Sequence, residues 1–169
     1  LAVARPEADR QGVELVPGVE MTCEYEGREV HLLGYYFREH PALIAALERL
    51  RADRVGRFAA MAAKLESLGM VVDLAAVRRC FPRATLGRRH LAEYLHKTKQ
   101  APSVREVFDR YLADGKPADV SKARLDAFEA LALVRDGGGV VSWAHPPYNL
   151  RLDSLRALAE AGLAGIEVA

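Results

Sequence analysis

The residues Val140-Val141-Ser142-Trp143-Ala144-His145-Pro146-Pro147 form an apolar run that ends at a histidine and two prolines. The run predicts a buried strand, and the prolines end it because proline has no N–H to donate to a neighbouring strand. Parallel α/β proteins place catalytic and metal-binding groups at the carboxyl ends of such strands. The stretch therefore predicts an α/β fold with His145 at a functional edge. A strand that ends in an incidental histidine is the alternative.

The composition is that of an ordinary globular protein. The 169 residues are 50% hydrophobic and 28% charged, which allows one domain or one domain with an insertion. A net charge of only +1 argues against general electrostatic binding to nucleic acids. No apolar stretch approaches the length of a transmembrane span, and charged residues interrupt the start of the chain, where a signal peptide needs an apolar run. We therefore expect a cytoplasmic protein that does not associate with membranes.

Both ends of the sequence look cut. The chain begins at Leu1 inside a helical pattern over residues 2–11, and it stops at Ala169 inside a strand pattern over 163–168. We therefore expect this chain to be a segment of a longer protein.

The first forty residues predict mainly β-structure after a short helix. The helical pattern over 2–11 ends at a glycine, and residues 13–16 predict a strand. The β-forming runs over 17–25 and 29–37 flank a turn at Gly27, which predicts a hairpin.

The middle of the chain predicts helices only. From Pro41 to Leu68 apolar residues recur every three or four positions, which predicts a long amphipathic helix closed by Gly69. Its length leaves room for a kink near Gly56. Further helices are predicted over 74–81, 85–95 and 103–115, the last opening with a capping box formed by Ser103 and Glu106.

After a polar connector, helix and strand alternate again. The predicted order is a helix over 123–134, the strand over 140–145, a helix over 152–161 and a strand over 163–168. The patterns at the two ends of the chain therefore predict pieces of an α/β barrel or layered sheet. The helical pattern between them predicts an insertion. We expect the boundaries to give segments 1–68, 69–120 and 121–169.

Three residues in predicted strands form a candidate metal site. Glu20 interrupts an otherwise apolar and small-residue strand, and a carboxylate there is costly to bury without a cation or a donor. His31 in the paired strand and His145 are suitable partners, because a glutamate and two neutral imidazoles bind divalent metals well. The alternative is that Glu20 faces solvent and that His31 is a hydrogen-bonded core histidine.

A second candidate site is basic. Gly87-Arg88-Arg89-His90 begins a predicted helix, whose free N–H groups favour an anion, and arginine offers a bidentate fork for phosphate. A solvated basic turn is the alternative. We expect His40 and His96 to be surface residues and Trp143 to belong to the core.

Five short motifs follow one another along the chain, namely Pro17-Gly18-Val19-Glu20, Val30-His31-Leu32-Leu33-Gly34, Gly87-Arg88-Arg89-His90-Leu91-Ala92, Ala144-His145-Pro146 and Gly165-Ile166-Glu167-Val168. In this order they resemble the PHP (polymerase and histidinol phosphatase) family. The resemblance is to its bacterial branch of nucleoside 3′,5′-bisphosphate phosphatases and RNase AM-like proteins, and it covers nearly the whole chain.

The resemblance implies a fold and a chemistry. Family members have a distorted (β/α)7 barrel, here partial and with an all-helical insertion, which binds up to three divalent metals (Mn, Fe, Zn or Mg) for phosphoester hydrolysis. By position, Glu20 resembles the bridging carboxylate, and His31 and His145 resemble ligands of one metal. Arg88 resembles the arginine of the insertion that holds the substrate phosphate, and His90 its neighbouring helper. The implied substrates are small nucleotides or short RNA ends.

The chain also departs from the family pattern. The family's His-x-His, Thr-Asp-His-Asp and Ser-Asp-x-His motifs are absent, which fits the cut ends and implies that the isolated segment is inactive. The family's Ala-His-Pro-Gly-Arg-Tyr is Ala144-His145-Pro146-Pro147-Tyr148-Asn149 here. The expected phosphate-binding arginine near position 148 is therefore missing, and Arg151 is its candidate substitute. Alternative functions are a histidinol-phosphatase-type or polymerase-associated activity, or a catalytically silent module that binds a partner.

Overall fold

The computed structural model describes residues 3–168, which form two compact units. The sheet unit comprises Leu1–Leu47 and Arg124–Ala169, and the helical unit comprises Glu48–Ala123. The first division falls inside helix α2 (Pro41–Ser67), which contributes residues to both units, rather than after residue 68. The second falls three residues beyond the expected boundary at 120.

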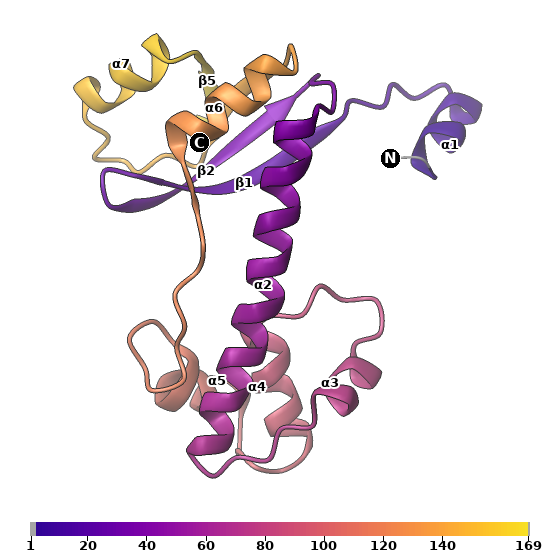
Figure 1. Ribbon diagram of the computed structural model, residues 1–169, viewed down its shortest axis with the longest axis vertical. Coiled ribbons are helices and arrows are strands. Elements are labelled where there is room, and N and C mark those ends of the chain that lie inside the picture. Colours follow the sequence, from indigo (N-terminus) through magenta and orange to yellow (C-terminus); the bar gives the residue numbers. More distant parts are fainter. Residues whose placement is uncertain (1–2, 169) are drawn as a thin grey trace. The chain divides into compact units, whose positions relative to one another are not determined.

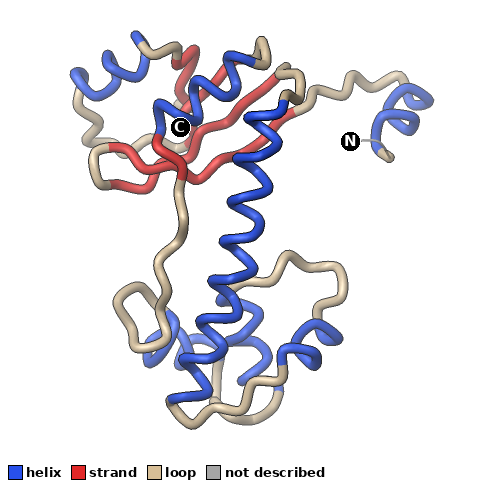
Figure 2. Tube along the Cα trace, viewed as in Figure 1, coloured by secondary structure: helices blue, strands red, loops and turns tan. Residues whose placement is uncertain are grey.

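The sheet unit contains a mixed five-stranded sheet. Its strand order is β3-β1-β2-β4-β5, with β1 and β2 antiparallel, β2 and β4 antiparallel, and the two outer pairs parallel. Figure 2 draws the strands in red. The strands are β1 (Gly18–Tyr25), β2 (Arg28–Tyr35), β3 (Leu125–Asp126), β4 (Val140–Ala144) and β5 (Leu163–Ile166). The predicted hairpin is confirmed: Glu26 and Gly27 both have positive φ, as a two-residue hairpin turn requires.

One face of this sheet is buried against helix α6 (Ala127–Asp136). Side chains alternate along a strand, so Met21 and Cys23 of β1 face the helix with Leu32 of β2, and all three are at most 1% exposed. Trp143 joins this core from β4, as predicted. Glu20 and His31 lie on the opposite face of the sheet, which α6 does not cover. Their side chains are therefore free to form a functional site.

Two glycine positions let α6 approach the sheet. A Cβ atom added at Gly34 would lie 2.8 Å from Cγ2 of Val134, and one added at Gly139 would lie 2.7 Å from the carbonyl oxygen of Tyr35. Both distances are shorter than ordinary van der Waals contact. The glycine run over 137–139 thus allows the chain to leave α6 and enter β4 directly against the end of β2.

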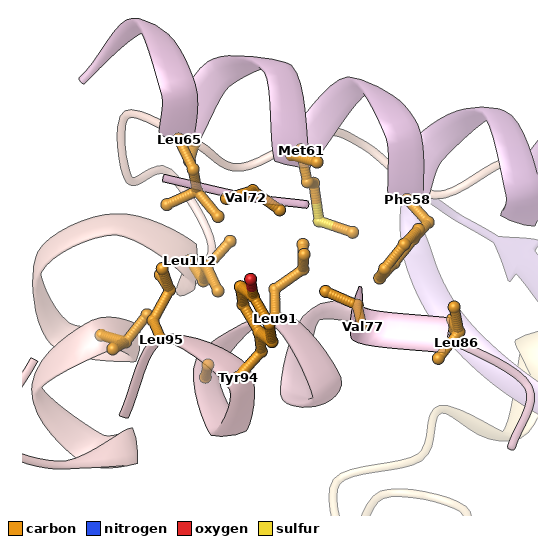
Figure 3. Close-up of a cluster of buried hydrophobic side chains, with 14 residues drawn as sticks. Phe58, Met61, Leu65, Val72, Val77, Leu86, Leu91, Tyr94, Leu95 and Leu112 are labelled. Carbon is orange, nitrogen blue, oxygen red and sulfur yellow. The ribbon is translucent and has the colours of Figure 1, made fainter. Parts of the chain in front are cut away.

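The helical unit, whose ribbon is drawn in Figure 1, has its own core of buried side chains (Figure 3). Phe58, Met61 and Leu65 point from α2 into a cluster that also contains Val77, Leu91 and Leu95 (Figure 3). The elements after α2 are α3 (Leu74–Cys80), α4 (Arg88–Lys97), α5 (Val104–Val107) and the π-helix η1 (Phe108–Leu112). Each fully buried leucine contributes about 1.5–3 kcal/mol of transfer free energy, so this cluster gives the unit a core of its own.

Helix α2 continues through Gly56 without interruption, so it is not split there. Nothing lies within 4 Å of the place where a Cβ of Gly56 would be, so the residue faces open space on an otherwise regular helix. The helix ends before Gly69, whose φ of 87° is the predicted left-handed termination. None of the helices within residues 3–168 combines the length and hydrophobicity needed to span a membrane.

Several predicted elements differ from the structure. Residues 13–16 form no strand after helix α1 (Ala4–Gln11), since no described strand pairs with them and Val13 is exposed. The helix predicted over 103–115 stops at Leu112 after changing to a π-helix. The helix predicted over 123–134 begins at Ala127, because the Asp126 carboxylate accepts from the N–H of Phe128 and caps it there. Helix α7 (Leu152–Glu160) matches its prediction within one residue.

Candidate metal centre

The strand register brings the three predicted metal ligands together. His31 of β2 is the cross-strand partner of Thr22, two residues beyond Glu20 on β1, so Glu20 and His31 are diagonal neighbours on one face. On its other side His31 pairs with Ala144, the last residue of β4, and His145 follows directly. One potential ligand atom from each of the three residues lies within 4.8 Å of the other two.

Nδ1 of His31 is at the centre of the group. It lies 3.1 Å from Oε1 of Glu20 and 3.1 Å from Nε2 of His145. The side chain of Glu20 is 56% exposed and that of His31 is 26% exposed, so the group is open to solvent on the glutamate side. One carboxylate and two imidazoles suit a divalent transition metal, and the convergence of three such atoms supports the predicted site.

The backbone bends sharply where it presents His145. This residue has a φ of 36°, in the left-handed region that non-glycine residues seldom occupy. Its N–H donates to Oε2 of Glu167 at 2.8 Å, and the N–H of Glu167 donates to the carbonyl oxygen of Trp143 at 2.8 Å. Glu167 therefore supports the bend through its side chain.

The second nitrogen of His31 has a carboxylate partner. Nε2 of His31 lies 3.4 Å from Oε1 of Glu29, and Oε2 of Glu29 accepts from Nε and Nη2 of Arg124 at 3.1 and 3.0 Å. Sequence reasoning missed both residues. Glu29 lies two residues before His31 and so on the same face of β2, which is a signal the sequence carried. Arg124 is 95 residues away from Glu29 and had no such signal.

A cavity of about 740 Å³ opens beside the metal ligands. Its walls include His31 and His145 together with Arg28 and Arg151. Arg151 is the residue before helix α7, and Arg28 is the first residue of β2, a position that sequence reasoning did not consider. Neither guanidinium has an ion-pair or hydrogen-bond partner among the described residues. The cavity therefore combines atoms of two candidate metal ligands with unpaired positive charge.

The carboxylates that line this cavity already have hydrogen-bond or ion-pair partners. Both oxygens of Glu26 lie 2.9 Å from Oγ of Ser154, and Glu29 is held by Arg124. The unpaired charges on this wall are therefore those of the two arginines.

Arg88 and His90 lie in the helical unit and make structural contacts there. Nη1 of Arg88 donates to Oδ1 of Asp114 at 2.5 Å, and this hydrogen bond lowers the pKa of the Asp114 carboxyl. The guanidinium also lies over the ring of Phe108, 5.8 Å from its centroid. His90 accepts the N–H of Gly87 on Nδ1 at 3.1 Å, and it thereby caps the start of its own helix.

Of the other histidines, one differs from its prediction. His40 is half-buried rather than at the surface, because its Nε2 lies 2.8 Å from the carbonyl oxygen of Leu133. His96 is exposed, as predicted.

Comparisons with known proteins identify relatives over the whole chain, although no family model matches it. The 3′,5′-nucleoside bisphosphate phosphatase of Chromobacterium violaceum is 34% identical over all of the chain and 62% of its own length. The 5′-3′ exoribonuclease Rnm of Escherichia coli is 31% identical over 94% of the chain and 55% of its own length.

A solved structure is similar in fold. It is that of a protein from Bifidobacterium adolescentis with a provisional assignment as a metal-dependent phosphoesterase, with a TM-score of 0.80 and 26% identity over 98% of this chain and 61% of that one. The chain thus spans between about half and two thirds of the length of the relatives it matches.

Proposed function

This chain belongs to the PHP (polymerase and histidinol phosphatase) family, and from that premise we propose that the whole protein is a metal-dependent phosphoesterase. Its substrates would be phosphate esters of small nucleotides or short RNA ends. The observation that carries this proposal is the convergence of Glu20, His31 and His145 beside a cavity with two unpaired arginines. The sheet unit would be part of a distorted (β/α)7 barrel, and residues 69–120 its helical insertion.

Within this proposal the three clustered residues hold one divalent ion. Glu20 offers a carboxylate oxygen, and His31 and His145 offer imidazole nitrogens that must be unprotonated to bind. When bound, such an ion acts as a Lewis acid that activates water and offsets the charge of the reacting phosphate.

The cavity supplies substrate recognition. Arg28 and Arg151 line it next to the metal ligands, and a guanidinium matches the oxygens of a phosphate with two parallel hydrogen bonds. Because no described carboxylate pairs with either arginine, a phosphate would not have to displace an existing ion pair there.

Arg88 and His90 are the proposed phosphate contacts of the helical unit. Arg88 is bonded to Asp114, so a phosphate would have to share or replace that carboxylate. His90 uses Nδ1 to cap its helix, which leaves Nε2 as its available atom. We further propose that the 169 residues alone are inactive, because they hold only one cluster of metal ligands among the described residues.

The test uses the product of the complete gene. With Mn²⁺ present, phosphate release would be measured from a nucleoside 3′,5′-bisphosphate and from histidinol phosphate, and release of mononucleotides from short 5′-phosphorylated RNA. We expect the nucleotide or the RNA to be hydrolysed, and Glu20→Gln and His145→Ala to abolish both turnover and metal binding. His96→Ala is the matched control, since His96 is an exposed histidine of the helical unit.

Three results would count against the proposal. Turnover of histidinol phosphate alone would identify the other phosphatase type of the family. Metal binding without hydrolysis of any ester would favour a silent binding module. Turnover by the isolated 169-residue chain would refute its proposed inactivity.

A further inference from the structure

Two carboxylates face each other across the β1–β2 hairpin, close to the metal ligands. Glu24 of β1 is the cross-strand partner of Glu29 of β2. Directly opposed like charges destabilise a strand pair, so this pair needs a cation. Arg124 provides it: two of its nitrogens lie 3.0 and 3.1 Å from Oε2 of Glu29, and Nη1 lies 3.8 Å from Oε2 of Glu24.

The backbone fixes Arg124 in this position. Arg124 directly precedes β3, whose two residues pair with Cys23 and Glu24 of β1. The side chains of Arg124 and Glu29 are only 31% and 30% exposed, so solvent and salt screen their ion pair less than a fully exposed pair. The short strand β3 therefore holds the guanidinium against the hairpin.

A metal ion bound at Nδ1 of His31 would leave the proton of the neutral ring on Nε2. A neutral imidazole donates from one nitrogen and accepts at the other. Nε2 lies 3.4 Å from the Glu29 carboxylate, whereas Nδ1 faces Glu20 and His145. A proton on Nε2 satisfies Glu29 and leaves the Nδ1 lone pair directed at the metal-binding group.

We propose that Glu29 is a positioning residue for the metal ligand His31, and that Arg124 holds Glu29 in place. The proposal rests on the metal centre of the proposed function and adds to it a relay from Arg124 through Glu29 to His31. Glu29 accepts a hydrogen bond from Nε2 of His31, which fixes the plane of the ring and the direction of Nδ1. Carboxylates in this position behind metal-binding histidines commonly set both orientation and affinity.

The relay predicts graded effects on metal affinity. Glu29→Gln keeps the size of the side chain but removes its charge, and we expect it to weaken metal binding about 10- to 100-fold. Arg124→Gln should weaken binding in the same direction by less, since Glu29 remains. The double variant should bind no more weakly than Glu29→Gln alone, because Arg124 acts through Glu29.

The experiment measures Co²⁺ affinity of the full-length protein by competition with a chelating dye, and records the visible spectrum of the bound Co²⁺. Thermal unfolding of each metal-free variant is measured in parallel. Glu24→Gln is the matched control: Glu24 shares the hairpin and the contact with Arg124, but no hydrogen bond or ion pair joins it to His31 among the described residues. It should keep the wild-type affinity and spectrum. A Glu29→Gln variant with weaker binding, altered Co²⁺ bands and an unchanged unfolding temperature would support a positioning role.

The outcomes separate this inference from the proposed function. If the wild-type protein binds Co²⁺ and hydrolyses its ester while Glu29→Gln matches it in affinity and spectrum, the relay is wrong and the enzyme assignment stands. If Glu24→Gln and Glu29→Gln weaken Co²⁺ binding equally, the loss comes from the removed negative charge and not from the contact with His31. That result would also overturn the relay. A wild-type protein that binds no metal would overturn both.

Discussion

The backbone N–H of His145 donates a hydrogen bond to the side-chain carboxylate of Glu167, with 2.8 Å between the nitrogen and Oε2. This contact joins the residue after β4 to the residue after β5, and these two strands are parallel neighbours. It secures a backbone bend that a histidine adopts only at an energetic cost, since φ is 36°. A carboxylate outside the ligand group thus determines where a candidate ligand lies.

Removing this carboxylate should loosen the bend. We expect Glu167→Ala to lower the free energy of unfolding by on the order of 1 kcal/mol, the net contribution of a hydrogen bond to a partly solvated charged group. Metal affinity should fall as well, because the His145 ring loses its fixed position. Urea unfolding and metal competition would measure the two effects. Glu160→Ala is the control, as Glu160 is an exposed residue of α7 with no described partner. Unchanged metal affinity in Glu167→Ala would contradict the role assigned to this contact.

Two glycines should respond to alanine in opposite directions. In Gly34→Ala the new Cβ would lie 2.8 Å from Cγ2 of Val134, so we expect a loss of about 1–3 kcal/mol from overpacking. Gly56→Ala meets nothing within 4 Å in the middle of α2, and it should stabilise by about 0.5–1 kcal/mol because alanine is the better helix former. Urea unfolding of both variants measures this difference. Combining Gly34→Ala with Val134→Ala should recover part of the lost unfolding free energy. If it does not, the clash with Val134 is not the cause of the loss.

The buried thiol of Cys23 predicts how the stability of the protein depends on pH. Burial, followed by the charges of Asp126 and Glu129, raises the pKa of Cys23 from 9.0 to about 12. Between these two pH values the Cys23 thiol therefore keeps its proton in the folded protein but has lost it in the unfolded chain. The resulting contribution to stability is complete below pH 9.0 and is lost progressively as the pH rises toward about 12.

Two measurements check the thiol. At pH 8 a thiol-specific reagent should modify the half-buried Cys80 in the native protein and reach Cys23 only after unfolding. The difference in unfolding free energy between pH 8 and pH 10 should be smaller in Cys23→Ala than in the wild type. Rapid native labelling of Cys23 would show that its position is more open than the structure indicates.

The clustering of the three candidate metal ligands was predictable because their positions are set locally. Glu20 and His31 stand out as polar residues in apolar strands, and His145 ends a strand before two prolines. The strand β3 was not predictable, since two residues carry no periodicity and its existence depends on pairing with β1. For the same reason β-forming residues at 13–16 did not make a strand: a strand needs a neighbour, and none of the described strands lies beside them.

The supporting contacts of the site escaped prediction for a related reason. Arg124 reaches Glu29 across 95 positions of sequence, and Glu167 reaches His145 across 22. Glu167 lies in one of the five short motifs, but neither that motif nor the sequence around Arg124 shows which residue each side chain contacts. Short motifs therefore indicate the candidate ligands, whereas their supporting contacts depend on the folded topology.

The ion pair between Arg88 and Asp114 allows a test of the role proposed for Arg88 in the helical unit. The Arg88 hydrogen bond lowers the pKa of Asp114 below its usual 3.8, so the pair contributes stability above that pH and loses it as the pH falls through the lowered value. In Asp114→Asn this acid-dependent contribution should disappear. The same change frees the guanidinium of Arg88, so substrate should bind more tightly, seen as a lower KM, if Arg88 holds its phosphate. Asp109→Asn is the control, because the Asp109 carboxylate is exposed and pairs with Arg105 instead. A KM that Asp114→Asn leaves unchanged, together with full activity of Arg88→Ala, would remove Arg88 from the proposed phosphate contacts.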